Sequence, residues 1–178
     1  SGNSGWWDGG GIYNYGNLVL LNSAVFGNST RELGGGIYNS GALTATNSTI
    51  AGNFVLGYDY RYDSYGGGIY NSGTFTATNL TIAGNSAETG GGIFSTGSDS
   101  VTILNNTVVA GNEASSEPDI YRDSTATISG CHNFVGDGSG ALTLLNGVDG
   151  NRVGTAASPL DPHLSGWTQF ENGVWGYH

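Results

Sequence analysis

Carboxylates dominate the residues that could do chemistry, since the 178-residue chain holds 14 Asp and Glu against 4 Lys and Arg. A glycosidase needs two carboxyl groups about 5–10 Å apart, and in a repetitive chain such a pair can come from neighbouring repeats. Asp99 with Asp123, and Glu88 with Glu113, have spacings that fit this arrangement. The sequence forces neither pair together, and the chain has no lysine to assist a lyase. We therefore expect no catalytic residues and no enzyme.

Metal and nucleophile sites find no better support. His132, His163 and His178 lack the spacing of zinc ligands. Cys131 stands beside His132, but nothing else indicates a catalytic pair, and a buried packing role is the simpler interpretation. We expect no metal and no cofactor.

The composition excludes other classes of function. Net charge is −10, so the chain lacks the basic surface that a nucleic-acid partner requires. The longest strictly aliphatic run is Leu18 to Leu21, too short for membrane insertion. A single cysteine, no methionine and an acidic surface fit a chain exposed to oxidants. These features favour an extracellular or cell-surface location.

A repeated motif indicates the fold. The hexapeptide GGGIYN at residues 9–14 recurs at 34–39 and 66–71, and returns altered as GGGIFS at 90–95. Its isoleucines, with Ile120 in a decayed fifth copy, are separated by 25, 32, 24 and 27 residues. A period in this range is typical of solenoids.

The second half of each repeat also recurs, for example LTATNSTIAGN at 43–53 and FTATNLTIAGN at 75–85. Apolar and polar residues alternate there, which predicts a strand with one buried face. Leu43 and Ile50 must both face inward although they are seven apart, so a corner falls between them at Asn47. The pattern predicts an all-β, right-handed parallel β-helix of about six or seven coils. We expect one domain over 1–178, with regular repeats at 1–130 and irregular terminal coils and a tail at 131–178.

Stacking of equivalent residues would hold such a rod together. We expect one inward column of isoleucines and one corner ladder of asparagines, whose amides bond from coil to coil. The members of these columns are Ile12, Ile37, Ile69 and Ile93, and Asn22, Asn47 and Asn79.

The irregular segments are the candidates for partner or glycan contact. Residues 54–65 form an insertion rich in tyrosine, and insertions of solenoids often lie on the binding side. A loop that folds over the rod and shields apolar surface is the alternative interpretation. A pair of tryptophans before the first complete repeat could anchor a partner or close the end of the core. The candidate contact residues are Tyr58, Tyr60, Arg61, Tyr62, Tyr65, Trp6 and Trp7.

The repeat GGGIYNSGxLTxTNSTIAGN resembles that of very large bacterial surface proteins predicted to be right-handed β-helices. The stretch CHNFVGDGSG at 131–140 and the tail DPHL at 161–164 resemble the ends of such arrays. In that family these ends precede a choice-of-anchor region. The resemblance implies a bacterial surface protein and is specific for architecture rather than activity.

The sequence predicts a non-catalytic extracellular structural or adhesive module. Because residues 1–4 match the end of a repeat, we expect copies to stack end to end into a filament or surface array. Glycans or other surface proteins are further candidate partners. One alternative is a β-helix that binds or cleaves carbohydrate. A second is an ice-binding solenoid, suggested by Thr44, Thr46, Thr76 and Thr78, although Val19 and Leu21 interrupt that array.

Overall fold

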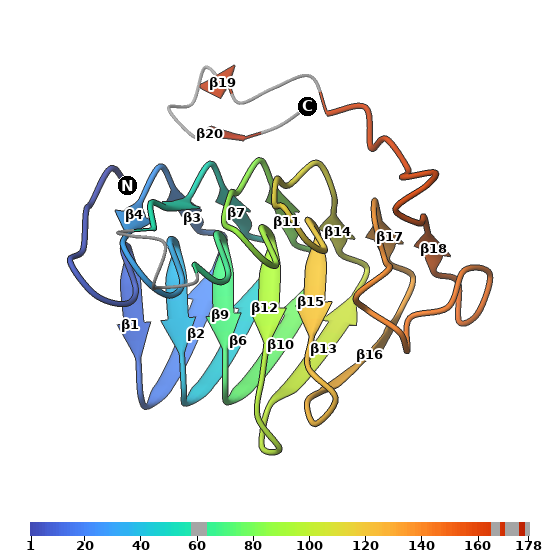
Figure 1. Ribbon diagram of the computed structural model, residues 1–178, viewed down its shortest axis with the longest axis horizontal. Helices are drawn as coiled ribbons and strands as arrows, with labels where there is room; N and C mark the ends of the chain where they lie inside the picture. The colour runs from blue at the N-terminus through green and yellow to red at the C-terminus, as the bar shows by residue number, and fades with distance from the viewer. Residues whose placement is uncertain (58–63, 165–167, 170–174, 177–178) are drawn as a thin grey trace.

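The protein is described here from a computed structural model, which describes residues 1–57, 64–164, 168–169 and 175–176. The chain winds as a right-handed parallel β-helix of about five turns (Figure 1). Each regular turn supplies one strand to each of three parallel sheets, so equivalent residues of successive turns lie side by side. The described part of the chain contains strands and turns but no helix. The predicted all-β parallel fold is confirmed.

Two of the sheets have five strands each. Sheet 1 consists of β1 (Ile12–Asn14), β5 (Ile37–Asn39), β9 (Ile69–Asn71), β12 (Ile93–Ser95) and β15 (Ile120–Arg122). Sheet 2 consists of β2 (Asn17–Leu21), β6 (Ala42–Thr46), β10 (Thr74–Thr78), β13 (Val101–Asn105) and β16 (Thr127–Cys131). The repeated hexapeptide therefore ends in sheet 1, and the alternating segment after it forms sheet 2.

Sheet 3 has six strands, and a fourth side of the coil carries a shorter ladder. Sheet 3 consists of β3 (Ala24–Phe26), β7 (Thr49–Ala51), β11 (Thr81–Ala83), β14 (Val108–Val109), β17 (Phe134–Val135) and β18 (Arg152–Val153). On the fourth side β4 (Ser29–Thr30) pairs in parallel with β8 (Phe54–Val55). Outside the coils, β19 (Thr168–Gln169) and β20 (Trp175–Gly176) pair antiparallel.

The winding is shorter than the six or seven coils predicted from the sequence. After β16 the chain adds only β17 and β18 to sheet 3, and neither sheet 1 nor sheet 2 gains another strand among the described residues. Residues 138–151 leave the coil as a series of turns. The predicted number includes irregular terminal coils within residues 131–178, where the structure has this series of turns and only short strands.

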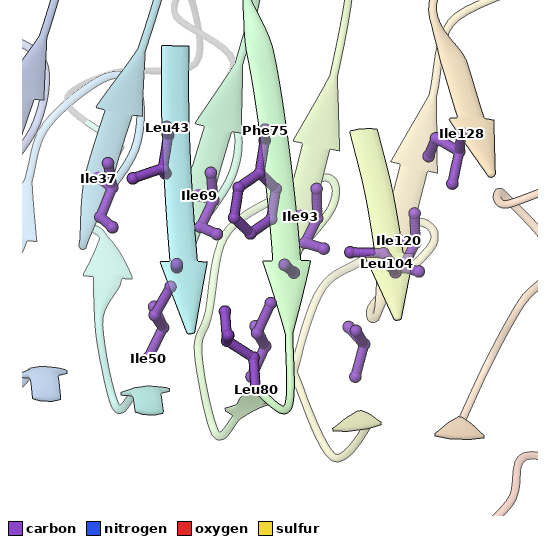
Figure 2. Close-up of a cluster of buried hydrophobic side chains, with 14 of the residues drawn as sticks. Ile37, Leu43, Ile50, Ile69, Phe75, Leu80, Ile93, Leu104, Ile120 and Ile128 are labelled. Atoms are coloured by element: carbon purple, nitrogen blue, oxygen red, sulfur yellow. The ribbon is translucent and has the colours of Figure 1, made fainter. Parts of the chain in front are cut away.

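The core is a set of parallel columns of apolar side chains. Ile12, Ile37, Ile69, Ile93 and Ile120 are register partners along sheet 1, and the last four are fully buried. Figure 2 shows this column facing side chains of sheet 2, among them Leu43 and Phe75. The columns continue through every turn, so each buried side chain packs against the equivalent side chains above and below it.

The corner between sheets 2 and 3 has the left-handed backbone that the phase slip required. Asn22, Asn47, Asn79 and Asn106 have φ between 48° and 55°, a region that asparagine tolerates better than most residues. Asn79 Nδ2 donates to Asn47 Oδ1 at 2.9 Å, and Asn106 Nδ2 donates to Asn79 Oδ1 at 2.7 Å. This ladder is exposed to solvent.

A second asparagine ladder lies inside the protein. Asn28, Asn53, Asn85 and Asn112 lie shortly after the sheet 3 strand of successive turns, and each is buried. Each of the first three donates through its side-chain amide to the side-chain oxygen of the next, at 2.9–3.0 Å. Amides of Asn53, Asn85 and Asn112 also donate to backbone carbonyls of the turn before, at 2.9–3.0 Å.

Two positions of the Gly34–Gly36 triplet require glycine, each for a different physical reason. Gly34 has φ +66°, which most side chains resist. At Gly36 a Cβ atom would lie 2.6 Å from the carbonyl oxygen of Gly68 and 2.9 Å from the buried amide of Asn53. The third glycine of the triplet is therefore needed because the buried ladder occupies the space beside it.

Candidate functional site at the N-terminal rung

The most deeply buried carboxylate continues the inner ladder. Asp119 replaces the third glycine of the triplet, and its Oδ1 accepts from Asn112 N at 3.1 Å and Asn112 Nδ2 at 2.8 Å. Its Oδ2 accepts from Asp137 N at 2.6 Å. Burial raises the pKa of Asp119 and outweighs these hydrogen bonds, which lower it. Both carboxylate oxygens of Asp119 therefore accept hydrogen bonds that hold the backbone in place.

A cavity of about 400 Å³ borders this carboxylate. Asp119, Asp137 and Asp161 line it, together with glycine, proline and leucine residues of neighbouring turns and of the tail. Asp137 Oδ1 accepts from Ser139 N at 2.9 Å, and Asp161 is largely exposed. Within the described ranges, no group of three or more His, Cys, Asp or Glu side chains could hold a metal ion.

Of the carboxylates considered as pairs from the sequence, Asp123 is the one whose oxygens accept several hydrogen bonds. Asp123 Oδ1 accepts from Thr125 N and Ala126 N, both at 2.8 Å, and its Oδ2 accepts from Gly97 N at 2.9 Å and from the Thr96 hydroxyl. Burial opposes the ionisation of Asp123, but these hydrogen bonds together outweigh it and hold its pKa well below the usual range. Asp123 is thus occupied in joining two loops, while Asp99, Glu88 and Glu113 lie exposed.

An aromatic ladder runs along the outer face of sheet 1. Its rings belong to Tyr13, Tyr38, Tyr70, Phe94 and Tyr121, which stack with centroids 4.5–5.4 Å apart and planes within 14°. The stacking covers the ring faces, which are the surfaces that would stack on a sugar. Burial and nearby anionic groups raise the pKa of Tyr70 to about 12. The sequence signal for this ladder is the tyrosine that recurs in the hexapeptide at positions 13, 38 and 70.

The candidate contacts of the insertion divide into two groups. Tyr58, Tyr60, Arg61 and Tyr62 lie outside the described residues. Tyr65 returns to the coil, where it forms isolated bridges to Leu33 and Thr89 and stacks on Phe94 at 4.4 Å. At this position the insertion covers part of the aromatic ladder.

The two tryptophans lie exposed beside the first turn. Trp6 and Trp7 have about 70% of their surface exposed, and the guanidinium carbon of Arg31 lies 3.7 Å from the Trp6 ring centroid. The Trp7 carbonyl accepts a hydrogen bond from the Thr30 hydroxyl. Neither indole closes the end of the core. In the next residue, Asp8, burial and the Glu32 carboxylate raise the pKa.

Strands β1, β2 and β3 form what we call the N-terminal rung, and each is an edge strand of its sheet in the described chain. Asn22 N donates to Thr46 O at 3.1 Å, and Ala42 N donates to Gly16 O at 2.8 Å. Along a parallel strand, the N–H and C=O groups of one residue point to the strand on one side, and those of the next residue point to the other side. The even-numbered residues of β2 therefore bond to β6, and the backbone groups of residues 17, 19 and 21 face the open side.

Exposed apolar side chains gather around this rung. Six of the eleven large hydrophobic residues that are exposed in the described chain fall within residues 6–21. We call them the apolar collar: Trp6, Trp7, Tyr13, Tyr15, Val19 and Leu21. Val19 and Leu21 are register partners of Thr44 and Thr46 in the next turn. The same outward columns are thus apolar in the N-terminal rung and hydroxylated in the two turns that follow.

The opposite end of the core is closed by residues 138–151, the C-terminal cap. Ala141 and Leu144 are buried against the last turn as part of the core. Gly140 passes so close to sheet 1 that a Cβ atom would lie 2.3 Å from the Ile120 carbonyl oxygen. Three apolar side chains of the cap, at positions 142, 145 and 148, are exposed.

Comparisons with family models, curated proteins and solved structures find no match to this chain. Among the described residues, no helix has the length and apolar character needed to cross a membrane. The function must therefore be argued from the geometry. The features that distinguish one part of this rod from another are the open edge and collar at one end and the cap at the other.

Proposed function

We propose that the chain is a non-catalytic structural or adhesive β-solenoid module of the extracellular space or cell surface, which associates with copies of itself. The acidic, lysine-free composition supports the location. The resemblance of its repeats to those of large bacterial surface proteins supports the same class. Engagement of Asp119 and Asp123 in holding the fold supports a role without catalysis.

One observation carries the proposal of self-association: exposed apolar side chains at the N-terminal rung lie beside the edge of β2, which has no further strand partner among the described residues. Unpaired edges accept further strands unless charge, proline or a covering segment blocks them. β2 carries no charged residue and no proline. Val19 and Leu21 stay about 60% exposed in the single chain, so a partner strand would bury apolar surface as well as satisfy backbone groups.

The test uses the open edge directly. Val19→Pro removes a backbone donor from the open side of β2, and it spares the bonds to β6 because those come from even-numbered residues. Val19→Thr is the matched control, since it keeps the N–H and restores the residue that neighbouring turns have. We expect light scattering coupled to gel filtration to show association of the native chain that rises with concentration. Val19→Pro should shift it to monomer, and Val19→Thr should retain it at least in part.

A native chain that stays monomeric up to the highest soluble concentration would refute self-association. So would a Val19→Pro variant that keeps native far-ultraviolet circular dichroism and associates as strongly as Val19→Thr.

A further inference from the structure

We propose that the cavity of about 400 Å³ beside Asp119 binds a primary ammonium group carried on a short aliphatic chain. A small free amine and the side chain of a lysine share this chemistry. The 178 residues include no lysine, so no side chain of this chain supplies the group. The proposal goes beyond the self-association proposed above and does not depend on it.

The tail, residues 154–164, builds one wall of the cavity and is held in place by its backbone. Gly154 N donates to Val135 O at 3.0 Å, and Leu160 N donates to Gly136 O at 2.9 Å. Figure 1 shows the tail running from β18 back along the rod. The end of the tail lies against the Ala-Gly corners of two earlier turns, around a second cavity of about 150 Å³. The wall is therefore formed without help from a ligand.

The size and the walls of the larger cavity suit a small molecule with an apolar part. Its volume of about 400 Å³ falls among small-molecule sites, which span about 300–1,000 Å³. All three prolines of the chain line it, at Pro118, Pro159 and Pro162. Proline has a fixed φ and no N–H, so these walls are apolar and rigid. A rigid site loses little conformational freedom on binding, which favours affinity.

The polar side chains of the described lining offer acceptors but no free donor. Asp119, Asp137 and Asp161 are carboxylates, which only accept hydrogen bonds when ionised. The Asn112 amide donates to Ile82 O at 3.0 Å and to Asp119 Oδ1 at 2.8 Å, so both of its protons are engaged. Such a lining repels an anion and favours a ligand that brings donors and positive charge. An ammonium group brings three N–H donors and one positive charge.

Asp137 is the lining carboxylate that the fold leaves incompletely bonded. Its side chain is only 5% exposed, and its Oδ1 accepts from Ser139 N at 2.9 Å. Its Oδ2 accepts from no donor among the described residues, and it is not sealed away from accessible space. A buried acceptor without a donor is costly, and an N–H group placed in the cavity would satisfy it.

The charges around the cavity favour the same ligand. Burial raises the pKa of Asp119, and the nearby Asp137 carboxylate adds to this shift. A cation placed between the two carboxylates would offset their repulsion. A metal ion fits less well, because the described chain has no group of three or more acidic, His or Cys side chains arranged to hold one.

A titration followed by nuclear magnetic resonance tests the proposal on the isotope-labelled chain. The probe is n-butylammonium chloride, with n-butanol and sodium butyrate as the neutral and anionic molecules of the same chain length. We expect n-butylammonium to cause saturable shifts of the backbone N–H signals of Gly111 and Gly136, which line the cavity. The other two molecules should leave these signals unchanged.

Two variants with the same change in net charge locate the binding. Asp137→Asn keeps the acceptor for Ser139 but removes the charge, and it should weaken binding of n-butylammonium by about 10–100-fold, as loss of one charge-assisted hydrogen bond does. Asp99→Asn, exposed between β12 and β13, should leave the affinity unchanged. Asp161→Asn, at a largely exposed carboxylate of the same cavity, should weaken binding too and serves if Asp137→Asn disturbs the fold.

The other outcomes overturn the proposal or identify the source of the ammonium group. Equal weakening by Asp99→Asn and Asp137→Asn would show attraction to the net charge alone and overturn it. Equal shifts with n-butanol, or a response to calcium chloride without one to n-butylammonium, would overturn it as well. If the proposal holds, tighter binding of Nα-acetyllysine methylamide than of n-butylammonium assigns the group to a lysine of a partner protein, and the reverse order assigns it to a free amine.

Discussion

The sharpest prediction about stability concerns the buried ladder at Asn53. Its Oδ1 accepts from Asn28 N at 3.0 Å and Asn28 Nδ2 at 2.9 Å, inside a site that is closed to solvent. Asn53→Ala removes this acceptor and leaves two buried donors without a partner. An unsatisfied buried donor costs about 1–3 kcal/mol, so we expect the free energy of unfolding to fall by about 2–6 kcal/mol. Urea unfolding followed by far-ultraviolet circular dichroism measures the loss.

The exposed ladder supplies the matched control. Asn47 accepts one side-chain bond, from Asn79 Nδ2, and its φ of 49° suits glycine. Asn47→Gly therefore removes an amide without orphaning a buried group or straining the backbone. We expect it to cost less than about 1 kcal/mol, since the partner that it frees can bond to water. If Asn53→Ala lowers the free energy of unfolding by no more than Asn47→Gly does, burial of the inner ladder does not add to its contribution to stability.

Two further predictions address the core and the acid dependence. Ile69 is fully buried between Ile37 and Ile93, so Ile69→Ala should lower the free energy of unfolding by about 2–5 kcal/mol. Urea denaturation measures this loss. A loss under about 0.5 kcal/mol, which is typical of surface positions, would contradict the burial of Ile69 in the core. Burial raises the pKa of Asp119, so the folded state binds this proton more tightly than the unfolded chain, and the stabilisation present below about pH 4 is lost as the pH rises through the folded pKa. Urea midpoints of the native chain should therefore fall relative to those of Asp119→Asn as the pH rises, and a difference that does not change with pH would refute the assignment.

Features that recur with the repeat could be predicted from the sequence. The isoleucine of each hexapeptide and the two-residue alternation after it specify the inward face, and the odd spacing from Leu43 to Ile50 requires a corner. At that corner Asn47 takes the left-handed conformation. Asn53 shows the limit of this reasoning. Hydropathy alone predicts that an asparagine lies at the surface. Because an asparagine recurs at this position in successive turns, each side-chain amide can hydrogen-bond to the next, and the polar column is buried inside the rod.

Features that occur once could not be predicted, because a single copy has no repeat to align with. Residues 141–144 read ALTL, close to the ALTAT of β6, but Gly138 and Gly140 precede them, and the segment turns across the end of the core. Nothing in the local sequence distinguishes the C-terminal cap from another coil. The last turn differs from a regular one because its outward backbone groups find partners in this segment, and such contacts join residues that no periodicity relates.

The positions that break the repeat therefore carry the functional argument. Stacking of identical columns accounts for the stability of the rod at every turn and would be satisfied by threonine at position 19 as well as by valine. Stability alone gives no reason for Val19 and Leu21 to replace, at the open rung, the threonines of the next two turns. Burial against a partner strand does give a reason, since exposed apolar area contributes nothing until it leaves water. The two ends of the described core differ in the same way. Ala141 and Leu144 of the C-terminal cap are buried against one end, whereas Leu18 and Leu20 at the other end are only partly buried.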